Sequence, residues 1–135
     1  RTAEEIKINI GSACPLKEKK EMPLRGRNLV TGLPEEIMVS SDDIRRALEK
    51  SIRQIVNTIK LAVEETPPEL SADIIDHGII MTGGSSQLRN FPELVERRTG
   101  VKAVLAEDAL FCVVKGTGIA LEHLDTYKKS ILTKK

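Results

Sequence analysis

The chain has 135 residues, of which 40% are hydrophobic, so it is long enough for one ordinary domain or for two smaller lobes. Its charge is nearly balanced, with 21 lysines and arginines against 20 aspartates and glutamates, and only 2% of its residues are aromatic. These values argue against nucleic acid as a partner, because its binding needs a basic field and often aromatic stacking platforms.

Targeting and metal-binding patterns are absent from the sequence. No apolar run approaches the roughly 18 residues that span a bilayer, and no signal peptide is found. Cys14 and Cys112 lie far apart without the spacing of a metal site or a disulfide framework. We therefore expect two reduced thiols in a cytoplasmic protein. Because the chain begins at Arg1 inside a helical pattern, we also expect it to be a piece of a longer protein.

A short helix is predicted at residues 2–10, where Ile6 and Ile10 fall on one face. Glu4 and Lys7 lie on another face of this helix, three residues apart. From the spacing alone, the favoured interpretation is a surface ion pair that stabilises the helix by roughly 0.2–0.5 kcal/mol.

A β-hairpin is predicted next, from two loosely alternating stretches at residues 22–30 and 33–39. Pro34 is compatible with an edge position or with the start of a strand. Ser40 then provides a hydroxyl cap for a long helix, in which apolar residues recur every three or four positions between residues 44 and 65. The polar face of this helix carries both signs of charge, so we expect core packing rather than membrane binding.

The second half of the chain alternates helices with short strands. A proline pair ends the long helix, and a short helical segment follows at residues 69–76. Strands are predicted at residues 79–82 and 101–105, with a helix between them that ends at Gly100. Two strands joined by a helix predict a right-handed parallel βαβ unit. The complete order predicts an α/β protein whose first half is an α+β lobe.

The end of the sequence predicts a helix with an interruption. Asp108 is placed to cap it, and the glycines of residues 116–118 are expected to interrupt it before it continues through residues 119–124. The lysine-rich end, from Lys128 onward, is expected to fray.

A glycine turn follows the first of these two strands, and it contains Gly83, Gly84, Ser85, Ser86 and Gln87. Strand, glycine turn and helix is an order in which backbone N–H groups can approach a phosphate or a nucleoside. Glycine lacks a Cβ, which allows positive φ and close approach of a ligand. A glycine pair after a strand is nevertheless more often a simple tight turn, so these residues alone leave both interpretations open.

Several motifs together resemble the MreB family of bacterial actin homologues over essentially the whole chain before the lysine-rich tail. The segments that carry the resemblance are Arg1–Glu4 with Gly11–Ala13, Gly26–Pro34, Thr66–Leu70, Asp73-Ile74, Gly78-Ile79, Thr82–Gly84 and Gly116–Gly118. The resemblance implies the actin-like ATPase (ribonuclease H-like) fold, with this chain as part of its second domain. It implies a nucleoside-contacting helix (1–10), a small outer lobe (11–67), a core lobe (68–126) and a tail (127–135).

The resemblance also implies a site for ATP with Mg²⁺ in the cleft between two large domains. In this family a Glu-x-x-Lys pair contacts the ribose and adenine side of ATP, and a glycine turn lies against the nucleoside and α-phosphate. The matching residues are Glu4, Lys7, Gly83, Gly84, Ser85, Ser86 and Gln87. Ser85 replaces a glycine common in the family, and Ala109 a common proline.

No catalytic residue and no metal ligand is assigned within the chain. The family's catalytic carboxylate and most Mg²⁺ contacts match segments that would precede Arg1. We therefore expect the fragment alone not to hydrolyse ATP, because phosphoryl transfer depends on such positioning groups.

The resemblance implies a cytoskeletal ATPase whose protomers stack head to tail into filaments that control cell shape. Self-association, the inner face of the cell membrane and the cell-wall elongation machinery are then expected for the longer protein. Two other interpretations remain open from the sequence. One is another ATPase of the actin superfamily, such as a chaperone or a sugar kinase, and the other is an interaction domain that binds no nucleotide.

Overall fold

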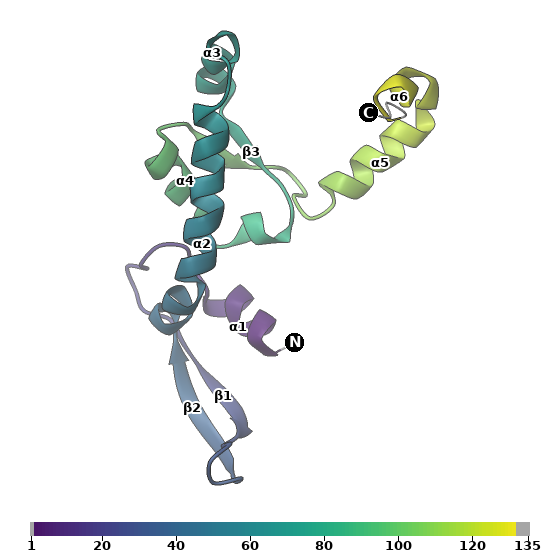
Figure 1. Cartoon of the computed structure of the whole chain (residues 1–135). Helices are drawn as coiled ribbons and strands as arrows, with labels where there is room; N and C mark the ends of the chain where they lie inside the picture. Colours follow the sequence, from purple (N-terminus) through teal and green to yellow (C-terminus); the bar gives the residue numbers. More distant parts are fainter. Residues whose placement is uncertain (1, 132–135) are drawn as a thin grey trace.

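The computed structural model describes residues 2–131 of the chain, and it contains helices and two small sheets (Figure 1). In chain order the elements are α1 (Thr2–Ile10), β1 (Glu21–Arg27), β2 (Pro34–Ser40), α2 (Ser41–Glu64), α3 (Pro68–His77), β3 (Ile79–Met81), the 3₁₀ turn η1 (Gly84–Gln87), α4 (Phe91–Thr99), β4 (Ala103–Leu105), α5 (Cys112–Glu122) and α6 (Leu124–Ile131). This order confirms the predicted alternation of helices and strands.

The hairpin of β1 and β2 is antiparallel, and its register runs from Glu21 opposite Ser40 to Arg27 opposite Pro34. Both strands are shorter at the turn than the sequence pattern predicts. Asn28 explains the difference, because its side-chain oxygen accepts a hydrogen bond from the Val30 amide at 2.8 Å and its carbonyl accepts one from a glycine amide of the turn. The backbone therefore leaves the ladder at this residue.

The long helix α2 begins with a capping box. The Ser40 hydroxyl accepts a hydrogen bond from the Asp43 amide at 3.3 Å, and the Asp43 carboxylate accepts one from the Ser40 amide at 3.1 Å. Two backbone donors that the first turn of a helix leaves unpaired are satisfied in this way. The predicted hydroxyl cap is thus confirmed, and the change from strand β2 to helix α2 is fixed within a few residues.

Strands β3 and β4 pair in parallel, with Ile79 opposite Ala103, and α4 connects them, so the predicted parallel βαβ unit is confirmed. Gly100 ends α4 with φ of 75°, and its amide donates to the Glu96 carbonyl at 2.8 Å. This left-handed conformation is the one predicted for Gly100, because a residue with a Cβ adopts it at a cost.

The core lies where α2 packs on α4 and on the β3–β4 pair. Val95 of α4 is fully buried, and Ile52 and Val56 of α2 contact the same cluster. Its buried members are Ile52, Val56, Met81, Phe91, Val95 and Ala103. One helix thus leads from the hairpin into the βαβ unit, and the division into an outer lobe and a core lobe stays a prediction.

Two predictions for the end of the chain are wrong. Gly116 and Gly118 do not interrupt the last helical segment, since α5 runs through both. Glycine lowers helix stability by about 1 kcal/mol but removes no hydrogen bond, unlike proline. Asp108 is not the cap, because it adopts φ of 50° and its carbonyl accepts from the Phe111 amide at 2.7 Å in a turn that precedes α5.

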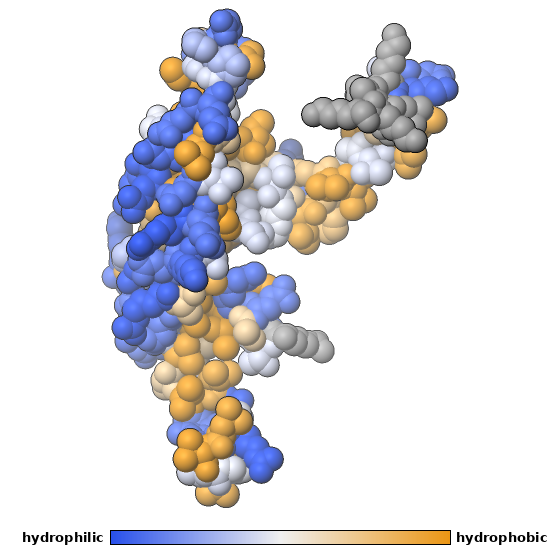
Figure 2. Space-filling view, viewed as in Figure 1, coloured by the Kyte–Doolittle hydropathy of each residue, from blue (hydrophilic) through white to orange (hydrophobic). Residues whose placement is uncertain are grey.

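Helices α5 and α6 extend away from the body and carry exposed apolar side chains (Figures 1 and 2). Val113 and Val114 are 73% and 69% exposed. Helix α6 continues to Ile131 and residues 132–135 lie outside the described part, so the fraying expected from Lys128 onward stays a prediction. Across residues 2–131, no helix is both long enough and apolar enough to cross a membrane.

The two phenylalanines of the chain allow a matched test of the core. Phe91 is 4% exposed, whereas Phe111 is 53% exposed. We expect Phe91→Ala to lower the free energy of unfolding by about 3–5 kcal/mol through loss of burial and creation of a cavity. Phe111→Ala should change it by less than about 0.5 kcal/mol. Urea unfolding followed by circular dichroism measures both, and equal effects would contradict the assignment of the core.

The capping box makes the stability of α2 depend on pH. The hydrogen bond from the Ser40 hydroxyl, and then that from Arg46, lower the pKa of Asp43 from 3.8 to about 2. A lowered pKa in the folded state stabilises the protein above pH 3.8, and this contribution is lost as the pH falls towards 2. Asp43→Asn lacks the titrating group, so the urea midpoints of variant and wild type should converge over this range. Parallel midpoint curves would refute this account.

Candidate functional site

The glycine turn lies directly after β3. Gly83 has φ of 85° and ψ of 165°, and its amide donates to the Ala109 carbonyl at 2.7 Å. The Ser86 hydroxyl donates to the Gly83 carbonyl at 2.6 Å, and this bond closes the turn from inside. A positive φ at this position favours glycine, so the turn needs Gly83 for its shape.

The amides of Gly84 and Ser85 are the part of the turn suited to an anion. Both residues are exposed at the start of η1, and within the described residues neither amide donates to an acceptor. Unpaired N–H groups in such a turn bind oxyanions such as phosphate. A Cβ at Gly84 would lie 3.3 Å from Leu110 Cδ1, whereas one at Gly83 would meet no atom within 4 Å. The backbone at Gly83 is therefore open to close approach from outside.

The other residues of the turn differ in how accessible they are. Ser85 and Gln87 are exposed, whereas Ser86 is only 5% exposed. Both the hydroxyl and the amide of Ser86 donate to the Gly83 carbonyl. Of the predicted site residues, Ser86 thus has its polar groups engaged inside the turn, so it shapes the turn instead of presenting a donor.

Glu4 and Lys7 lie on α1, where Glu4 is exposed and Lys7 is half-buried. Within the described residues, no ion pair or hydrogen bond joins the two side chains, so the surface ion pair that their spacing favours is not formed. Chemically, a carboxylate can accept hydrogen bonds from ribose hydroxyls, and an aliphatic lysine stem can pack against a base. Both groups are available for such contacts.

A crossing of two backbone segments connects α1 to the glycine turn. Ser12 follows α1 and pairs with Arg89, which follows η1, in a parallel bridge. The Ala13 amide donates to the Arg89 carbonyl at 2.8 Å, and the Arg89 guanidinium donates to the Gly11 carbonyl at 3.2 Å. Ser12 is 1% exposed, and its hydroxyl accepts from the Asn90 side chain. The crossing holds α1 and η1 on the same side of α2 (Figure 1).

Sequence reasoning missed this crossing. Asn90 gives a weak indication, because it adopts φ of 60° and asparagine tolerates this conformation. Arg89 gives none, since its guanidinium contacts backbone carbonyls that lie 78 and 80 residues away. Two groups of predicted residues, those of α1 and those of the turn, are therefore positioned by side chains outside the prediction.

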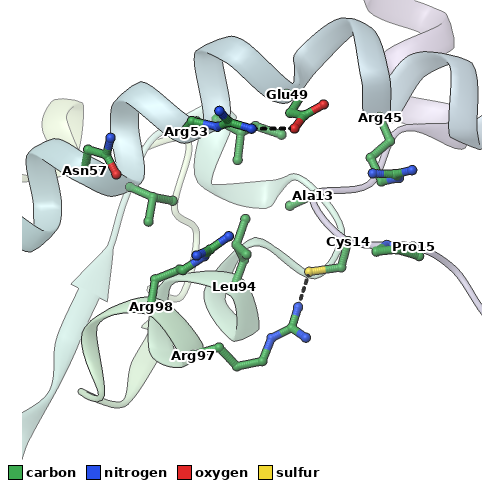
Figure 3. A pocket seen from close by; sticks show the side chains of 12 residues that line it. Ala13, Cys14, Pro15, Arg45, Glu49, Arg53, Asn57, Leu94, Arg97 and Arg98 are labelled. Carbon is green, nitrogen blue, oxygen red and sulfur yellow. Dashed lines mark hydrogen bonds and ion pairs between the residues drawn. The ribbon is translucent and has the colours of Figure 1, made fainter.

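Away from the glycine turn, a groove lies between α2 and α4, and its volume is about 520 Å³ (Figure 3). We name it the arginine groove. Its lining residues are Ala13, Cys14, Pro15, Arg45, Glu49, Ile52, Arg53, Val56, Asn57, Leu94, Arg97 and Arg98. None of them was singled out as a site residue from the sequence, because the arginines fall within ordinary polar faces of two helices.

Comparisons with known proteins agree on one family. The family described as MreB/Mbl protein matches residues 1–129. The cell shape-determining protein Mbl of Bacillus cereus is 45% identical over 132 residues, which are 98% of this chain and 40% of Mbl. The cell shape-determining protein MreB of Escherichia coli is 44% identical over 126 residues, which are 93% of this chain and 36% of MreB. The chain thus spans about two fifths of the length of these relatives.

The fold is also that of solved MreB structures. The crystal structure of MreB5 of Spiroplasma citri bound to ADP matches 98% of this chain and 40% of that chain, with a TM-score of 0.83 and 35% identity. The structure of the same protein bound to AMPPNP matches 97% of this chain with a TM-score of 0.83. These matches confirm the predicted actin-like ATPase fold. The chain belongs to the MreB/Mbl protein family.

Proposed function

We propose that the intact protein binds ATP and that this chain forms the nucleoside and α-phosphate side of the site. The observation that carries the proposal is the pair of unpaired amides at Gly84 and Ser85, in a turn anchored to α1. The solved MreB5 structures, which share this fold, are bound to ADP and to AMPPNP. The family and the geometry of the turn therefore support the same ligand.

Several of the predicted residues have a role that their chemistry supports. The amides of Gly84 and Ser85 donate to the α-phosphate, and exposed Gln87 lies beside them on the same turn. Glu4 accepts hydrogen bonds from the ribose hydroxyls, and Lys7 packs its stem against the adenine. When it is bound there, ATP supplies a phosphoryl group whose transfer to water releases free energy. Most contacts with Mg²⁺ come from outside this chain in the proposal.

The proposed role of the intact protein is a cytoskeletal ATPase that forms filaments and controls cell shape. The names of the bacterial relatives, which describe cell shape-determining proteins, support this role. We place the protein in the cytoplasm at the inner face of the membrane, with the cell-wall elongation machinery as its partner. Family membership favours this function over a chaperone, a sugar kinase or an interaction domain without nucleotide.

The hairpin offers a surface for head-to-tail contact with a second copy. Leu29 and Val30 at its tip are 97% and 94% exposed, and Leu33 is 65% exposed. Apolar side chains grouped at the end of a projecting hairpin are typical of a protein interface. We assign this tip to the contact with the next protomer, because a repeated contact that does not close produces a filament.

Substitutions at the turn test the nucleotide site. Gly84→Val in the intact protein should weaken ATP–Mg²⁺ binding by about tenfold or more, because the added side chain covers the amides and contacts Leu110. Glu4→Ala should weaken it through loss of the ribose contacts. Gly26→Val is the matched control, since a Cβ at Gly26 meets no atom within 4 Å and the residue lies in strand β1.

Isothermal titration calorimetry measures the affinity of all three variants. Unchanged affinity in both Gly84→Val and Glu4→Ala would overturn the proposed site and favour an interaction domain. An equal loss in Gly26→Val would instead indicate a general effect on folding.

A charge at the hairpin tip tests the filament contact. Leu29→Asp should reduce ATP-dependent pelleting of the intact protein several-fold, because a carboxylate cannot be buried in an apolar contact without a partner. Its ATP affinity should stay unchanged. Leu61→Asp introduces the same change at an exposed leucine of α2 and is the control. Normal pelleting of Leu29→Asp in a sedimentation assay would exclude the tip from the contact.

A further inference from the structure

The arginine groove follows α2 for a considerable length. Its lining on this helix runs from Arg45 to Asn57, which corresponds to about 18 Å along the helix axis. An extended peptide advances about 3.3 Å per residue, so five or six residues fit along this length. The opposite wall comes from α4 and from the segment that follows α1 (Figure 3).

The charge of the groove is strongly positive. Arg45, Arg53, Arg97 and Arg98 line it, and Glu49 is its single carboxylate. Arg53 donates to Glu49 at 2.7 Å, and Arg97 donates to the sulfur of Cys14 at 2.7 Å. Within the described residues, Arg97 and Arg98 therefore have no carboxylate partner, whereas Arg45 and Arg53 each have one.

Two of the arginines are incompletely satisfied. Within the described residues, Arg98 makes no hydrogen bond and no ion pair. The Nε atom of Arg45 is buried and donates no hydrogen bond, although the carboxylate of Asp42 lies 3.5 Å away. Guanidinium N–H groups that lack a hydrogen-bond acceptor bind carboxylates and phosphates well, because the fixed N–H fork matches two oxygens at once.

The floor of the groove is apolar. Ile52 and Val56 are 8% and 5% exposed, and Leu94 and Ala13 complete the floor beside them. In an extended peptide, successive side chains point to opposite sides. A ligand with alternating acidic and apolar residues can thus place its carboxylates among the arginines and its apolar side chains on the floor.

We infer that the arginine groove docks an extended acidic segment of a partner protein, five or six residues long, in which acidic and apolar residues alternate. Charge complementarity with the arginines favours a partner segment with negative charge. The length of the groove favours a peptide over a single anion. Arg45 and Arg53 lie about 12 Å apart along the helix axis, so one small anion cannot contact both. The inference is independent of the nucleotide site, since no residue of the groove belongs to the glycine turn or to α1.

Fluorescence anisotropy on the intact protein tests the inference with a labelled peptide, Asp-Leu-Glu-Leu-Asp-Leu. Arg98→Glu should weaken peptide binding by about tenfold or more, because it replaces a hydrogen-bond donor with a negative charge that repels the acidic peptide. Lys50→Glu makes the same change of charge on α2, outside the groove, so it should change binding by less than about twofold. Glu49→Gln removes the single carboxylate of the groove and should strengthen binding.

A second peptide, Asn-Leu-Gln-Leu-Asn-Leu, keeps the leucines but replaces every carboxylate with an amide. It therefore measures binding by apolar contacts alone, and it should bind at least about tenfold more weakly. The inference is overturned if the acidic peptide fails to bind, if both peptides bind equally, or if Arg98→Glu and Lys50→Glu behave alike. It is also overturned if Arg98→Glu abolishes pelleting and leaves peptide binding intact, since the occupant is then a second copy. ATP affinity measured on Arg98→Glu should match the wild type, which separates this test from that of the nucleotide site.

Discussion

The crossing of the segments after α1 and after η1 is the constraint on which the site depends. Its hydrogen bonds involve three backbone carbonyls and three side chains, and the side chains are those of Ser12, Arg89 and Asn90. Because Ser12 is almost completely buried, its hydroxyl needs a protein partner. The crossing thus adds direct hydrogen bonds between the segment after α1 and the segment that leads into α4. The relative position of two distant groups of site residues therefore rests on one main-chain hydrogen bond and on bonds made by the side chains of Ser12, Arg89 and Asn90.

Helix α2 provides the second constraint, since it belongs to both halves of the molecule. Its capping box fixes its start at the end of the hairpin, and Ile52 and Val56 fix its middle against α4. The hairpin has no comparable core of its own, and most of its side chains are exposed. Its orientation is consequently set by the rigid helix that follows it. A projecting, self-paired hairpin on a rigid helix can present its tip to another molecule.

Local patterns predicted most of the fold, because capping residues, proline breaks and apolar periodicity act within a few residues. Ser40 and Gly100 are examples in which a single side chain, or its absence, determines where a helix starts or ends. Gly116 and Gly118 misled the prediction, because the cost of glycine in a helix is smaller than the gain from an uninterrupted hydrogen-bond pattern. The roles of Arg89 and of the arginine groove depend on contacts between segments far apart, which no local pattern encodes.

The bond between the Gly83 amide and the Ala109 carbonyl gives the molecule a mechanical property. Ala109 is 2% exposed and lies three residues before α5, the first helix of the projecting arm. The base of the arm and the turn that presents the unpaired amides are therefore joined by a main-chain hydrogen bond. Any coupling free energy between ligand binding at the turn and the position of the arm is reciprocal.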